Sequence, residues 1–385
     1  MNERISLGIM TTRSPRFSPF PEEKFYAELA RIGKEKGLMV FTFFPEEINP
    51  YSRKINGFVW HEGKWKKGIF PYPTFVYDRV FYTASSLNRT RWKVADLRNQ
   101  PGTTFLNRGL PDKWKQFWCL RKNPRLVQHL PPQERYANGE QLRKWAQEGE
   151  VILKPLSGGF GQGVLHLVPG TPALLEGRTR ENRYFRKTFP SSEKAFRLVV
   201  PRLTSRYLIQ RYLSLTTLED RPFDIRLFMQ KDEEGVWRRA GLGVRIGKPH
   251  HLTSNLHGGG ITLSLDRFKE WEKGRIGENL DQILTPLGIE VAATLEKEYS
   301  PLFEMGIDIG IDRQNRIWIL EVNGKPGRDI FAQLGDLEGM KWVYSGPVRY
   351  ALYLLKLKKG EKGDAVANHE NKTYVGERRS SHRAP

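Results

Sequence analysis

The sequence predicts a mixed α/β protein built from more than one domain. Three observations support this: a strand–helix–strand order near the N-terminus, a strand that runs into a glycine-rich loop near residue 155, and an apolar hairpin with embedded acids near residue 310. Because the chain has 385 residues and typical domains have roughly 100–200, we expect two or three packed units. Its 38% hydrophobic content provides a sizeable core and excludes a mainly disordered chain.

The N-terminal third predicts an open sheet with helices on its faces. Phe25, Leu29 and Ile32 recur at helical spacing, and Gly37 follows as a stop signal. The expected elements are a strand at residues 5–10, a helix at 22–37, and strands at 38–44, 57–61, 65–70 and 74–80, of which 57–61 and 65–70 form a hairpin. This order is typical of an α/β unit.

A Pro/Gly-rich stretch at residues 99–111 predicts the first domain boundary. The elements expected after it are helices at 112–120 and 139–147, and strands at 150–154, 207–213, 223–230 and 236–246. Residues 179–194 are polar and charged, which predicts a loop or small lobe between these elements.

The C-terminal part predicts further helices around one hairpin. Residues 267–284 are expected to be partly helical, with a break at Pro286 and Gly288. The remaining expected elements are a helix at 289–298, a hairpin of 307–311 with 316–322, and a helix at 342–356. Residues 358–385 contain no Leu, Ile, Phe or Trp and are expected to form a disordered basic tail.

The chain is strongly basic, with 63 Lys/Arg against 43 Asp/Glu and a net charge of +20. The tail holds seven of these cations and four of these acids, so a charge of +17 belongs to residues 1–357. Such a field attracts polyanions, including nucleic acid, acidic polymers and phosphorylated ligands. Nucleic-acid binding is a distant alternative. The charge and a Trp interleaved with basic residues at 89–93 support it, but no nucleic-acid module is recognisable.

Several classes of protein are excluded or disfavoured. The single cysteine, Cys119, cannot form an internal disulfide or a Cys-based zinc site, and its setting in QFWCL predicts a buried structural thiol. The sequence contains no run of about 18 apolar residues, so no membrane span is expected. The N-terminus lacks the apolar core of a signal peptide, so we expect a cytoplasmic protein. The sequence contains no Gly-x-Ser-x-Gly motif, so no serine nucleophile is indicated.

The hairpin GIDIGIDRQNRIWILEVNGKPG predicts a site for a hard cation. If Ile311 faces Arg316, Asp308 lies opposite Ile319, and alternation then places Asp308, Glu321 and Asn323 on one face. Two carboxylates and an amide oxygen suit Mg²⁺ that bridges nucleotide phosphates. The alternative is a surface hairpin with ordinary polar residues. Solvation explains poorly why an acid lies within the apolar segment WILEVN, so this alternative is disfavoured.

The segment VILKPLSGGFGQGV predicts a phosphate-binding loop. A strand carries Lys154, and the loop after it contains Gly158, Gly159, Gly161 and Gly163. Glycines allow backbone N–H groups to approach phosphate oxygens, and the lysine adds a point charge. The segment fits neither a Walker A loop nor the dinucleotide fingerprint, and a plain turn is the alternative.

A third cluster follows in RPFDIRLFMQ, GVRIG and TSNLHGGG. Asp224 and Arg226 share a strand face, Arg245 lies on the next strand, and Asn255 precedes three glycines. The arginines are suited to a bidentate grip on a phosphate or carboxylate, and a purely structural ion pair is the alternative. His250, His251 and His257 suggest a metal site only weakly, because no cysteine or acid cluster accompanies them.

Taken in order, these residues resemble the ATP-grasp superfamily, in particular its YheC/YheD-like branch, the endospore coat-associated proteins of spore-forming bacteria. The segments that carry the resemblance are LPDKWKQFWCL, ILKPLSGGFGQGV, YLIQRYL, PFDIRLFMQKDEEGVWRRAGLGVRIG, TSNLHGGG and ILEVNGKPG, within residues 110–327. The resemblance implies an ATP-grasp fold in which two α+β lobes sandwich ATP. It implies an N-terminal domain at 1–108, lobes at 109–212 and 213–357, and a tail at 358–385.

The resemblance also implies roles for single residues. Lys115 (or Lys113) and Lys154 would contact the α- and β-phosphates. The loop of Ser157, Gly158, Gly159, Gly161 and Gly163 would close over the triphosphate. The backbone of the linker, Gln210, Arg211, Tyr212 and Leu213, would read the adenine edge, with Leu320 beneath the ring. Asp308, Glu321 and Asn323 would bind two Mg²⁺ ions, and Arg226, Arg245 and Asn255 would hold the γ-phosphate and an acyl-phosphate.

The implied activity is an ATP- and Mg²⁺-dependent carboxylate–amine ligase acting through an acyl-phosphate, with no protein nucleophile. The alternative is a non-catalytic, nucleotide-binding structural protein of the spore coat, and phosphorylation of an acidic molecule is a variant of the first. D-alanine–D-alanine ligases carry an arginine two residues before the first metal aspartate, where this chain has Gly306. Their substrates are therefore not carried over, although the basic charge suits an acidic substrate.

Overall fold

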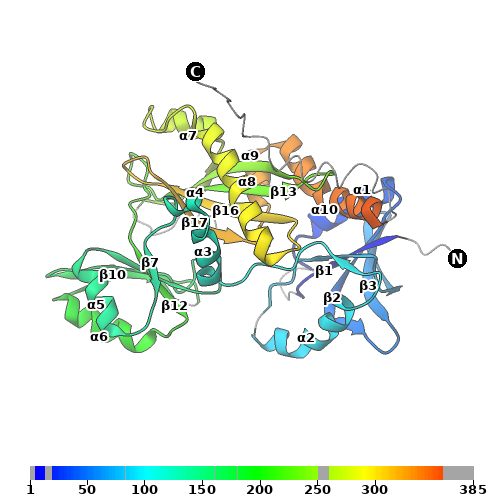
Figure 1. Cartoon of the computed structure of the whole chain (residues 1–385), viewed down its shortest axis with the longest axis horizontal. Helices are drawn as coiled ribbons and strands as arrows, with labels where there is room; N and C mark the ends of the chain where they lie inside the picture. Colours follow the sequence, from blue (N-terminus) through cyan, green and yellow to red (C-terminus); the bar gives the residue numbers. More distant parts are fainter. Residues whose placement is uncertain are drawn as a thin grey trace, which may run out of the picture. The chain divides into compact units, whose positions relative to one another are not determined.

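The predicted α/β class is confirmed by the computed structural model, which describes residues 5–13, 20–82, 84–159, 161–179, 181–249 and 260–358. The chain divides into two units (Figure 1). Unit 1 comprises Met1–Leu106, Lys231–Val236 and Tyr344–Pro385, and unit 2 comprises Asn107–Gln230 and Trp237–Val343. Within the described residues, no helix combines the length and apolar character needed to cross a membrane.

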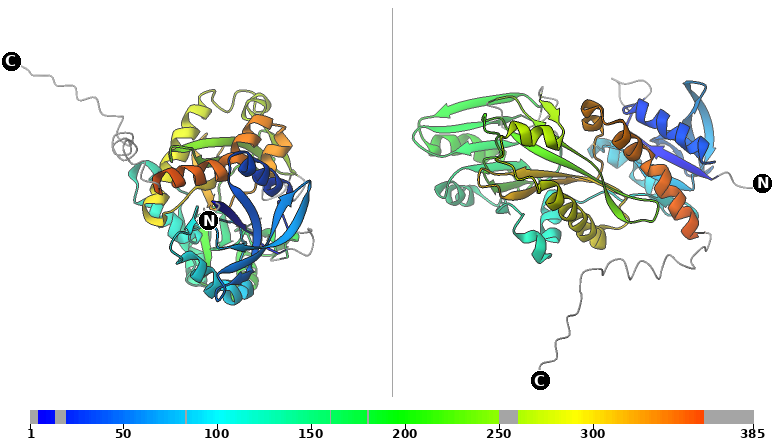
Figure 2. Two further views of the ribbon diagram at one scale, coloured as in Figure 1. Left: turned by 90° about the vertical axis from the view of Figure 1, so that its right-hand side faces the viewer. Right: turned by 90° about the horizontal axis from the view of Figure 1, so that it is seen from above.

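Unit 1 is built on a six-stranded sheet in the order β4-β3-β2-β1-β5-β6. The strands are β1 (Ser6–Met10), β2 (Met39–Asn49), β3 (Lys54–His61), β4 (Lys64–Pro71), β5 (Phe75–Asp78) and β6 (Thr104–Phe105). β2, β1, β5 and β6 are parallel, whereas β3 and β4 form an antiparallel hairpin. The helices are α1 (Glu23–Glu35), α2 (Ala84–Arg98) and the later part of α10 (Leu337–Lys358), which lies beside α1 (Figure 2).

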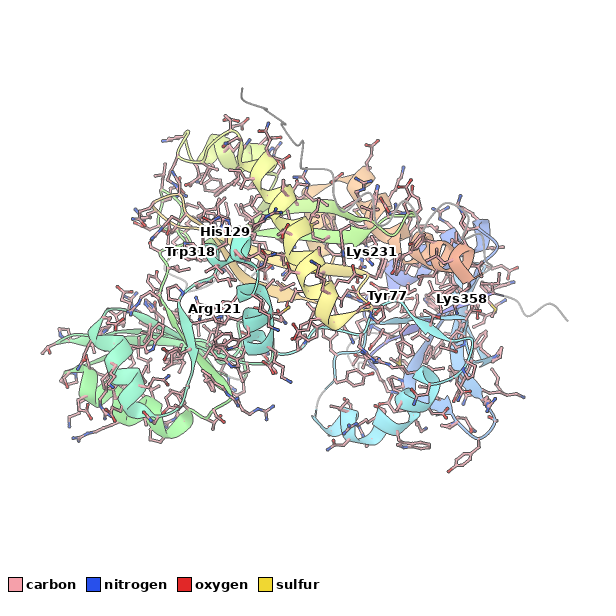
Figure 3. The ribbon with its side chains drawn as sticks, in the orientation of Figure 1. Tyr77, Arg121, His129, Lys231, Trp318 and Lys358 are labelled. Carbon is pink, nitrogen blue, oxygen red and sulfur yellow. The ribbon has the colours of Figure 1, made fainter. Side chains whose placement is uncertain are left out.

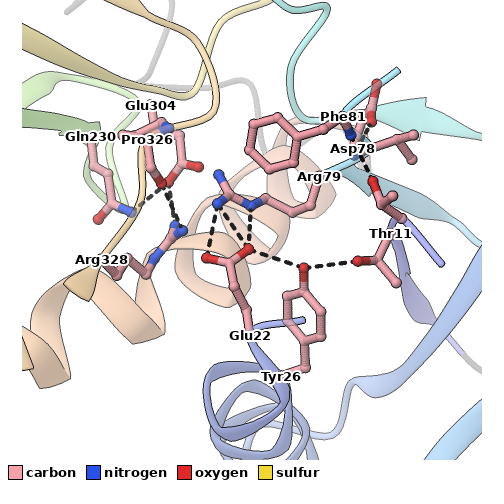
Figure 4. Close-up of polar contacts among 12 residues, drawn as sticks. Thr11, Glu22, Tyr26, Asp78, Arg79, Phe81, Gln230, Glu304, Pro326 and Arg328 are labelled. Carbon is pink, nitrogen blue, oxygen red and sulfur yellow. Dashed lines mark hydrogen bonds and ion pairs between the residues drawn. The ribbon is translucent and has the colours of Figure 1, made fainter. Parts of the chain in front are cut away.

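A buried polar cluster lies at the carboxyl ends of β1 and β5 (Figure 4). The guanidinium of Arg79, which is 1% exposed, donates to both carboxylate oxygens of Glu22 at 2.9 Å. The hydroxyl of Tyr26 donates to the same carboxylate at 3.1 Å and lies 3.1 Å from that of Thr11. The ion pair ties the start of α1 to the end of β5, and it satisfies an arginine that would otherwise be costly to bury.

The first sheet of unit 2 has the order β11-β10-β9-β8-β12-β7. Its strands are β7 (Gln133–Arg135), β8 (Val151–Pro155), β9 (Leu165–Val168), β10 (Ala173–Arg178), β11 (Tyr184–Phe189) and β12 (Tyr207–Arg211). Helices α5 (Gly139–Gln147) and α6 (Ser192–Val199) contribute Leu142 and Phe196 to a core shared with Val151, Leu153 and Leu167. One sheet face is therefore covered, and alternation directs Ile152 and Lys154 to the other face.

The second sheet of unit 2 has the order β15-β14-β13-β16-β17. Its strands are β13 (Phe223–Lys231), β14 (Trp237–Ile246), β15 (Ile261–Leu263), β16 (Glu304–Ile311) and β17 (Ile317–Asn323). The helices of this part are α3 (Lys113–Arg121), α4 (Pro124–Val127), α7 (Leu265–Trp271), α8 (Leu280–Tyr299) and α9 (Asp329–Leu334). Residues of α3 and α8, including Phe117 and Leu284, pack in one core with Ile307 and Ile309 of β16.

Two expectations about these elements were wrong. Residues 179–194 are not a loop, because they contain β11 and the start of α6. No break occurs at Pro286 and Gly288, because α8 continues through both. The hydrogen at Gly288 allows close packing on β13: a Cβ there would lie 2.6 Å from Leu227 Cδ2. This tertiary packing outweighs the low helix propensity of both residues.

Other elements had no clear signal in the sequence. α2 was not predicted, because its buried side chains are few: Thr90, Val94 and Leu97. β9 and β10 were also not predicted. The expected disordered tail, apart from Lys358, lies outside the described residues.

Candidate functional site

The hairpin of β16 and β17 contains a bulge that places the predicted metal ligands. Ile309 pairs with Ile319, but the next residue along β16, Asp308, pairs with Glu321. The expected pairing of Asp308 with Ile319 was therefore wrong for two reasons: Ile311 pairs with Ile317 rather than with Arg316, and Leu320 then adds one extra residue in β17. The bulge leaves Ile319 in the core and turns Glu321 and Asn323 to the face of Asp308.

The outer edge of β17 is held by the segment between α4 and β7. Ile319 N donates to His129 O at 2.7 Å, and His129 Nδ1 lies 2.9 Å from Ile317 O. Figure 3 labels His129 close to Trp318 on this strand. These bonds occupy backbone groups that an edge strand would otherwise expose. They hold β17 at Ile317 and Ile319, just before the bulge at Leu320.

A row of charged side chains crosses β13, β16 and β17. Arg226 pairs directly with Asp308 across the two strands, and its Nη2 donates to Asp308 Oδ2 at 3.1 Å. Arg245 on β14 donates through Nε to Asp224 Oδ1 at 2.6 Å, and its Nη2 lies 3.0 Å from Asp308 Oδ1. Burial alone would raise the pKa of Asp308, but the two arginines hold that pKa below its ordinary value.

Gly306 makes room for this arrangement. A Cβ at Gly306 would lie 2.9 Å from Pro326 Cβ and 3.1 Å from Arg226 Cδ. The space beside Asp308 is therefore filled by an arginine from the neighbouring strand.

Of the two lysines considered at the start of α3, the structure brings Lys113 to the site. Asp112 caps the helix by accepting from Trp114 N and Lys115 N, both at 3.1 Å. Lys113 Nζ lies 3.3 Å from Glu321 Oε1 and donates to Gly158 O at 3.3 Å. The side chain of Lys115 is exposed instead. One lysine thus connects the glycine-rich loop to the carboxylates.

Lys154 lies where the two sheets of unit 2 meet. Its Nζ donates to Gln210 Oε1, and to Leu320 O at 3.4 Å. Burial, with a smaller contribution from the charge of Lys113, lowers the pKa of Lys154 to about 8, against an opposing effect of Glu321. This ammonium group therefore loses its proton far more readily than an exposed lysine.

The glycine-rich loop between β8 and β9 has an unusual backbone. Gly158, Gly161 and Gly163 have φ of +120°, +71° and +71°, which disfavour other residues. At Gly163 a Cβ would lie 3.0 Å from Pro155 Cγ, whereas at Gly158 and Gly159 it would meet open space. Ser157, Gly158 and Gly159 are exposed, so this part of the loop presents mainly backbone to a ligand.

The N–H groups at the end of β12 and at the start of the linker after it bond within the protein. Arg211 N donates to Pro132 O and Tyr212 N to Glu150 O, both at 3.0 Å. The guanidinium of Arg211 binds Trp145 O and Glu148, away from Lys154. Leu213 is half-buried at the end of this segment.

Sequence reasoning missed His166, which supports the linker. Its Nε2 lies 2.8 Å from Glu150 and its Nδ1 3.0 Å from Glu176. Its ring stacks on Tyr212 with centroids 4.2 Å apart. His166 pairs with Ile152 of β8, so it lies on the same sheet face as Lys154. No motif marks this position, because Glu176 faces it from the neighbouring strand β10 and Glu150 lies just before β8.

A buried ion pair anchors the segment after β17 (Figure 4). Arg328 Nη2 donates to Glu304 Oε2 at 2.6 Å, and Gln230 Nε2 donates to the same oxygen at 3.0 Å. Arg328 is 3% exposed and Glu304 is fully buried. The pair fixes the backbone just beyond Asn323, and sequence reasoning also missed it.

The predicted metal ligands lie together, with compensating cations around them. Asn323 Nδ2 donates to Asp308 Oδ2 at 3.3 Å, and Glu321 is next to Lys113. Among the described residues, no three His, Cys, Asp or Glu side chains gather as a metal-binding group. Asn255, His250, His251 and His257 lie outside the described residues.

Comparison with known proteins identifies the family of this chain. A family model described as YheC/D-like ATP-grasp matches residues 102–354. The endospore coat-associated protein YheC of Bacillus subtilis (strain 168) is 32% identical over 369 residues, which cover 93% of this chain and 98% of that protein. The endospore coat-associated protein YheD of the same strain is 26% identical over 323 residues, covering 82% and 70%.

A solved structure has the same fold. The ATP-grasp ligase PsnB, complexed with a minimal precursor, superposes with a TM-score of 0.50 at 13% identity. The match covers 90% of this chain and 99% of that one. The α+β fold, the family model and the extent of identity to YheC agree: this chain belongs to the YheC/D-like ATP-grasp family.

Proposed function

We propose that this protein is an ATP- and Mg²⁺-dependent carboxylate–amine ligase. One observation carries the proposal. Lys113 and Lys154 join the glycine-rich loop and linker of the first sheet to the carboxylate hairpin of the second sheet. In this proposal residues 109–212 and 213–357 are the two lobes that sandwich ATP, and residues 1–108 form the preceding domain.

We assign nucleotide binding to side chains and backbone groups that, in this structure, bond to other groups of the protein. Lys113 and Lys154 would exchange Gly158 O and Gln210 for the α- and β-phosphates, where a cation is stabilised by nearby negative charge. The loop from Ser157 to Gly163 would close over the triphosphate, with the exposed backbone of Ser157, Gly158 and Gly159 toward it. Because Arg211 N and Tyr212 N are already bonded, we assign the adenine-reading N–H to Leu213. Leu320 would pack beneath the ring.

The residues present fit magnesium. Asp308 and Glu321 are direct cross-strand neighbours on one face, an arrangement that repels unless cations lie close by. Arg226, Arg245 and Lys113 provide that compensation in the structure. We propose that Asp308, Glu321 and Asn323 hold two Mg²⁺ ions through carboxylate and amide oxygens. When bound, the ions would neutralise charge on the transferring phosphoryl group.

The proposed reaction has two steps. A substrate carboxylate oxygen attacks the γ-phosphorus, the bond between this phosphorus and the β–γ bridging oxygen breaks, and ADP leaves. An amine then attacks the acyl carbon and loses a proton, the C–O bond to phosphate breaks, and phosphate leaves. Arg226, Arg245 and Asn255 are assigned to the transferring phosphate and the acyl-phosphate. Catalysis then rests on positioning and charge stabilisation, and no protein nucleophile is required.

A second candidate is a nucleotide-binding structural protein without catalysis. It is favoured by the internal pairing of the site, since Lys113, Lys154 and Asp308 all have protein partners. YheC and YheD are named as endospore coat-associated proteins, and we carry that association to this chain as part of either proposal. The basic charge would suit acidic substrates or acidic coat material.

Calorimetric titration tests the nucleotide site first. The protein is titrated with a non-hydrolysable ATP analogue and Mg²⁺, beside Lys154→Ala and Lys115→Ala. We expect binding by the wild type and by Lys115→Ala, and loss of binding in Lys154→Ala. Binding would justify screening carboxylates and amines for ADP release, and acceptor-independent ADP release would contradict ligation. No binding by the wild type would contradict both candidates.

A further inference from the structure

The hairpin of β3 and β4 in unit 1 concentrates positive charge that the proposed reaction does not use. Residues 51–71 hold five Lys/Arg against one Asp/Glu. A two-residue turn joins the strands at Glu62 and Gly63, with φ of +50° and +74°, as tight hairpins require. Glu62, the single acid, lies 3.3 Å from Lys66. Most of the charge on this hairpin therefore has no opposite charge within it.

β4 is the first strand of its sheet and pairs with β3 on one side. Figure 1 labels β3, the strand that joins β4 to the rest of the unit 1 sheet. An edge strand presents backbone N–H and C=O groups that can pair with another extended chain. The sheet holds β4 firmly, because Phe70 at its end is buried and stacks on Phe41 with centroids 4.3 Å apart. The edge is therefore a fixed template.

The side chains of β4 give this edge a definite pattern. Lys64 and Lys66 are exposed and lie on the face of buried Phe70. Trp65, Lys67 and Ile69 alternate on the other face. Ile69 is 69% exposed, and Trp65 packs against Trp60 of β3 with ring centroids 5.1 Å apart. The edge thus offers cations on both faces, with apolar contacts between them on one face.

We propose that the edge of β4, which pairs with no other strand among the described residues, is a docking site for an acidic, extended segment of a partner protein, which adds to the sheet as a further strand. Strand addition satisfies the backbone of both chains, and opposite charges on facing strands stabilise the pairing. Lys64 and Lys66 are two residues apart, about 6.8 Å in a strand, which is also the spacing of alternate acids on the partner. A second copy of this chain is a poor occupant, because its β4 would bring lysines against lysines.

The pattern also specifies the partner sequence. In an antiparallel arrangement, acids would face Lys67, Lys66 and Lys64, and apolar residues would face Ile69 and Trp65. A matching probe is the capped peptide Val-Thr-Glu-Glu-Val-Glu with a fluorescent label on a flexible N-terminal spacer. The docking site is in unit 1 and uses none of the proposed nucleotide-binding residues, so it stands or falls independently of the proposed ligation.

Fluorescence anisotropy with the full chain tests the charge requirement. We expect the probe to bind the wild type, and the triple variant Lys64→Glu, Lys66→Glu and Lys67→Glu to bind at least about tenfold more weakly, since each reversal turns an attraction into a repulsion. The triple variant Lys36→Glu, Lys144→Glu and Lys297→Glu has the same net charge and should bind like the wild type. No binding by the wild type, or equal weakening in both variants, would overturn the proposal.

Backbone methylation of the probe tests strand addition itself. Two peptides are made, N-methylated at the odd or at the even positions, with identical charge. Only one set of N–H groups on an added strand points toward β4, so one peptide should lose binding and the other should keep most of it. Equal retention by both would show attraction by charge alone and overturn strand addition. A single-stranded oligonucleotide of equal charge that binds more tightly and displaces the probe would also overturn it.

Discussion

Two hairpins of this protein treat charge in opposite ways. The β16–β17 hairpin of unit 2 places Asp308 and Glu321 side by side, and buries Asp308 between Arg226 and Arg245. In unit 1, the segment of residues 51–71 that forms the β3–β4 hairpin holds five cations and one acid. Both are antiparallel pairs at the edge of a sheet, so strand geometry does not explain the difference.

Solvation explains it. A carboxylate removed from water needs an opposite charge and hydrogen bonds, because the desolvation penalty is several kcal/mol per ion. Lysines that remain in water need no opposite charge nearby, and an excess of them on the surface helps to keep the protein soluble. Unbalanced charge on the surface therefore remains available to an external partner, whereas balanced buried charge holds a site in one geometry. Four predictions test this distinction.

The largest effect is expected for Glu321→Gln. This change removes a proposed metal-binding charge but leaves the side-chain shape, so Mg²⁺-dependent ADP release should fall by about 1000-fold. Glu321 is 27% exposed and pairs with one lysine, so the free energy of unfolding should change by less than about 1 kcal/mol. Steady-state turnover and chemical denaturation measure the two quantities. Glu62→Gln is the matched control, and unchanged turnover in Glu321→Gln would refute the metal assignment.

The next effect concerns stability. Asp308→Asn removes the carboxylate that faces Arg226 and Arg245, so it should lower the free energy of unfolding by about 3 kcal/mol. The same type of change at exposed Glu62, Glu62→Gln, should stay within about 0.5 kcal/mol. Urea denaturation followed by circular dichroism compares the two variants. Similar losses in both would contradict the role given to burial.

The third effect is a pH dependence of nucleotide binding. Because the pKa of Lys154 is lowered to about 8, the dissociation constant for an ATP analogue should rise above this pH, by up to about tenfold per pH unit. Lys154→Arg keeps its charge and should show a flat profile from pH 7 to 10. Calorimetry at four pH values measures the dissociation constant. A flat wild-type profile would argue against contact between Lys154 and phosphate.

Stability should respond to the same group with the opposite sign. The unfolded chain keeps the ordinary lysine pKa of 10.5, so between about pH 8 and 10.5 the unfolded state binds more protons than the folded one. The contribution of Lys154 to the free energy of unfolding should therefore increase as the pH rises through this window. This sign follows because burial of the charged amine is unfavourable below pH 8.

The sequence allowed prediction of the elements whose own residues repeat at a clear period. The helix expected at 139–147 matches α5 (Gly139–Gln147), and the strands expected near 223–230 and 236–246 match β13 and β14. β11 and α6 were missed because charged residues mask their apolar positions, such as Phe189 and Phe196. α8 was split because Pro286 is a local signal, while the packing of Gly288 on Leu227 is not local.

The sequence by itself determined the composition of the site: the lysine before a glycine-rich loop, the paired arginines, and the acids within an apolar hairpin. Which of these residues meet was decided by tertiary structure. The bulge at Leu320, on a strand whose outer edge bonds to His129, turns Glu321 toward Asp308. Lys113 rather than Lys115 reaches Glu321, and His166 supports Tyr212 from another strand. A one-residue shift reverses the face of every side chain that follows it, and such a shift depends on contacts far away in the chain.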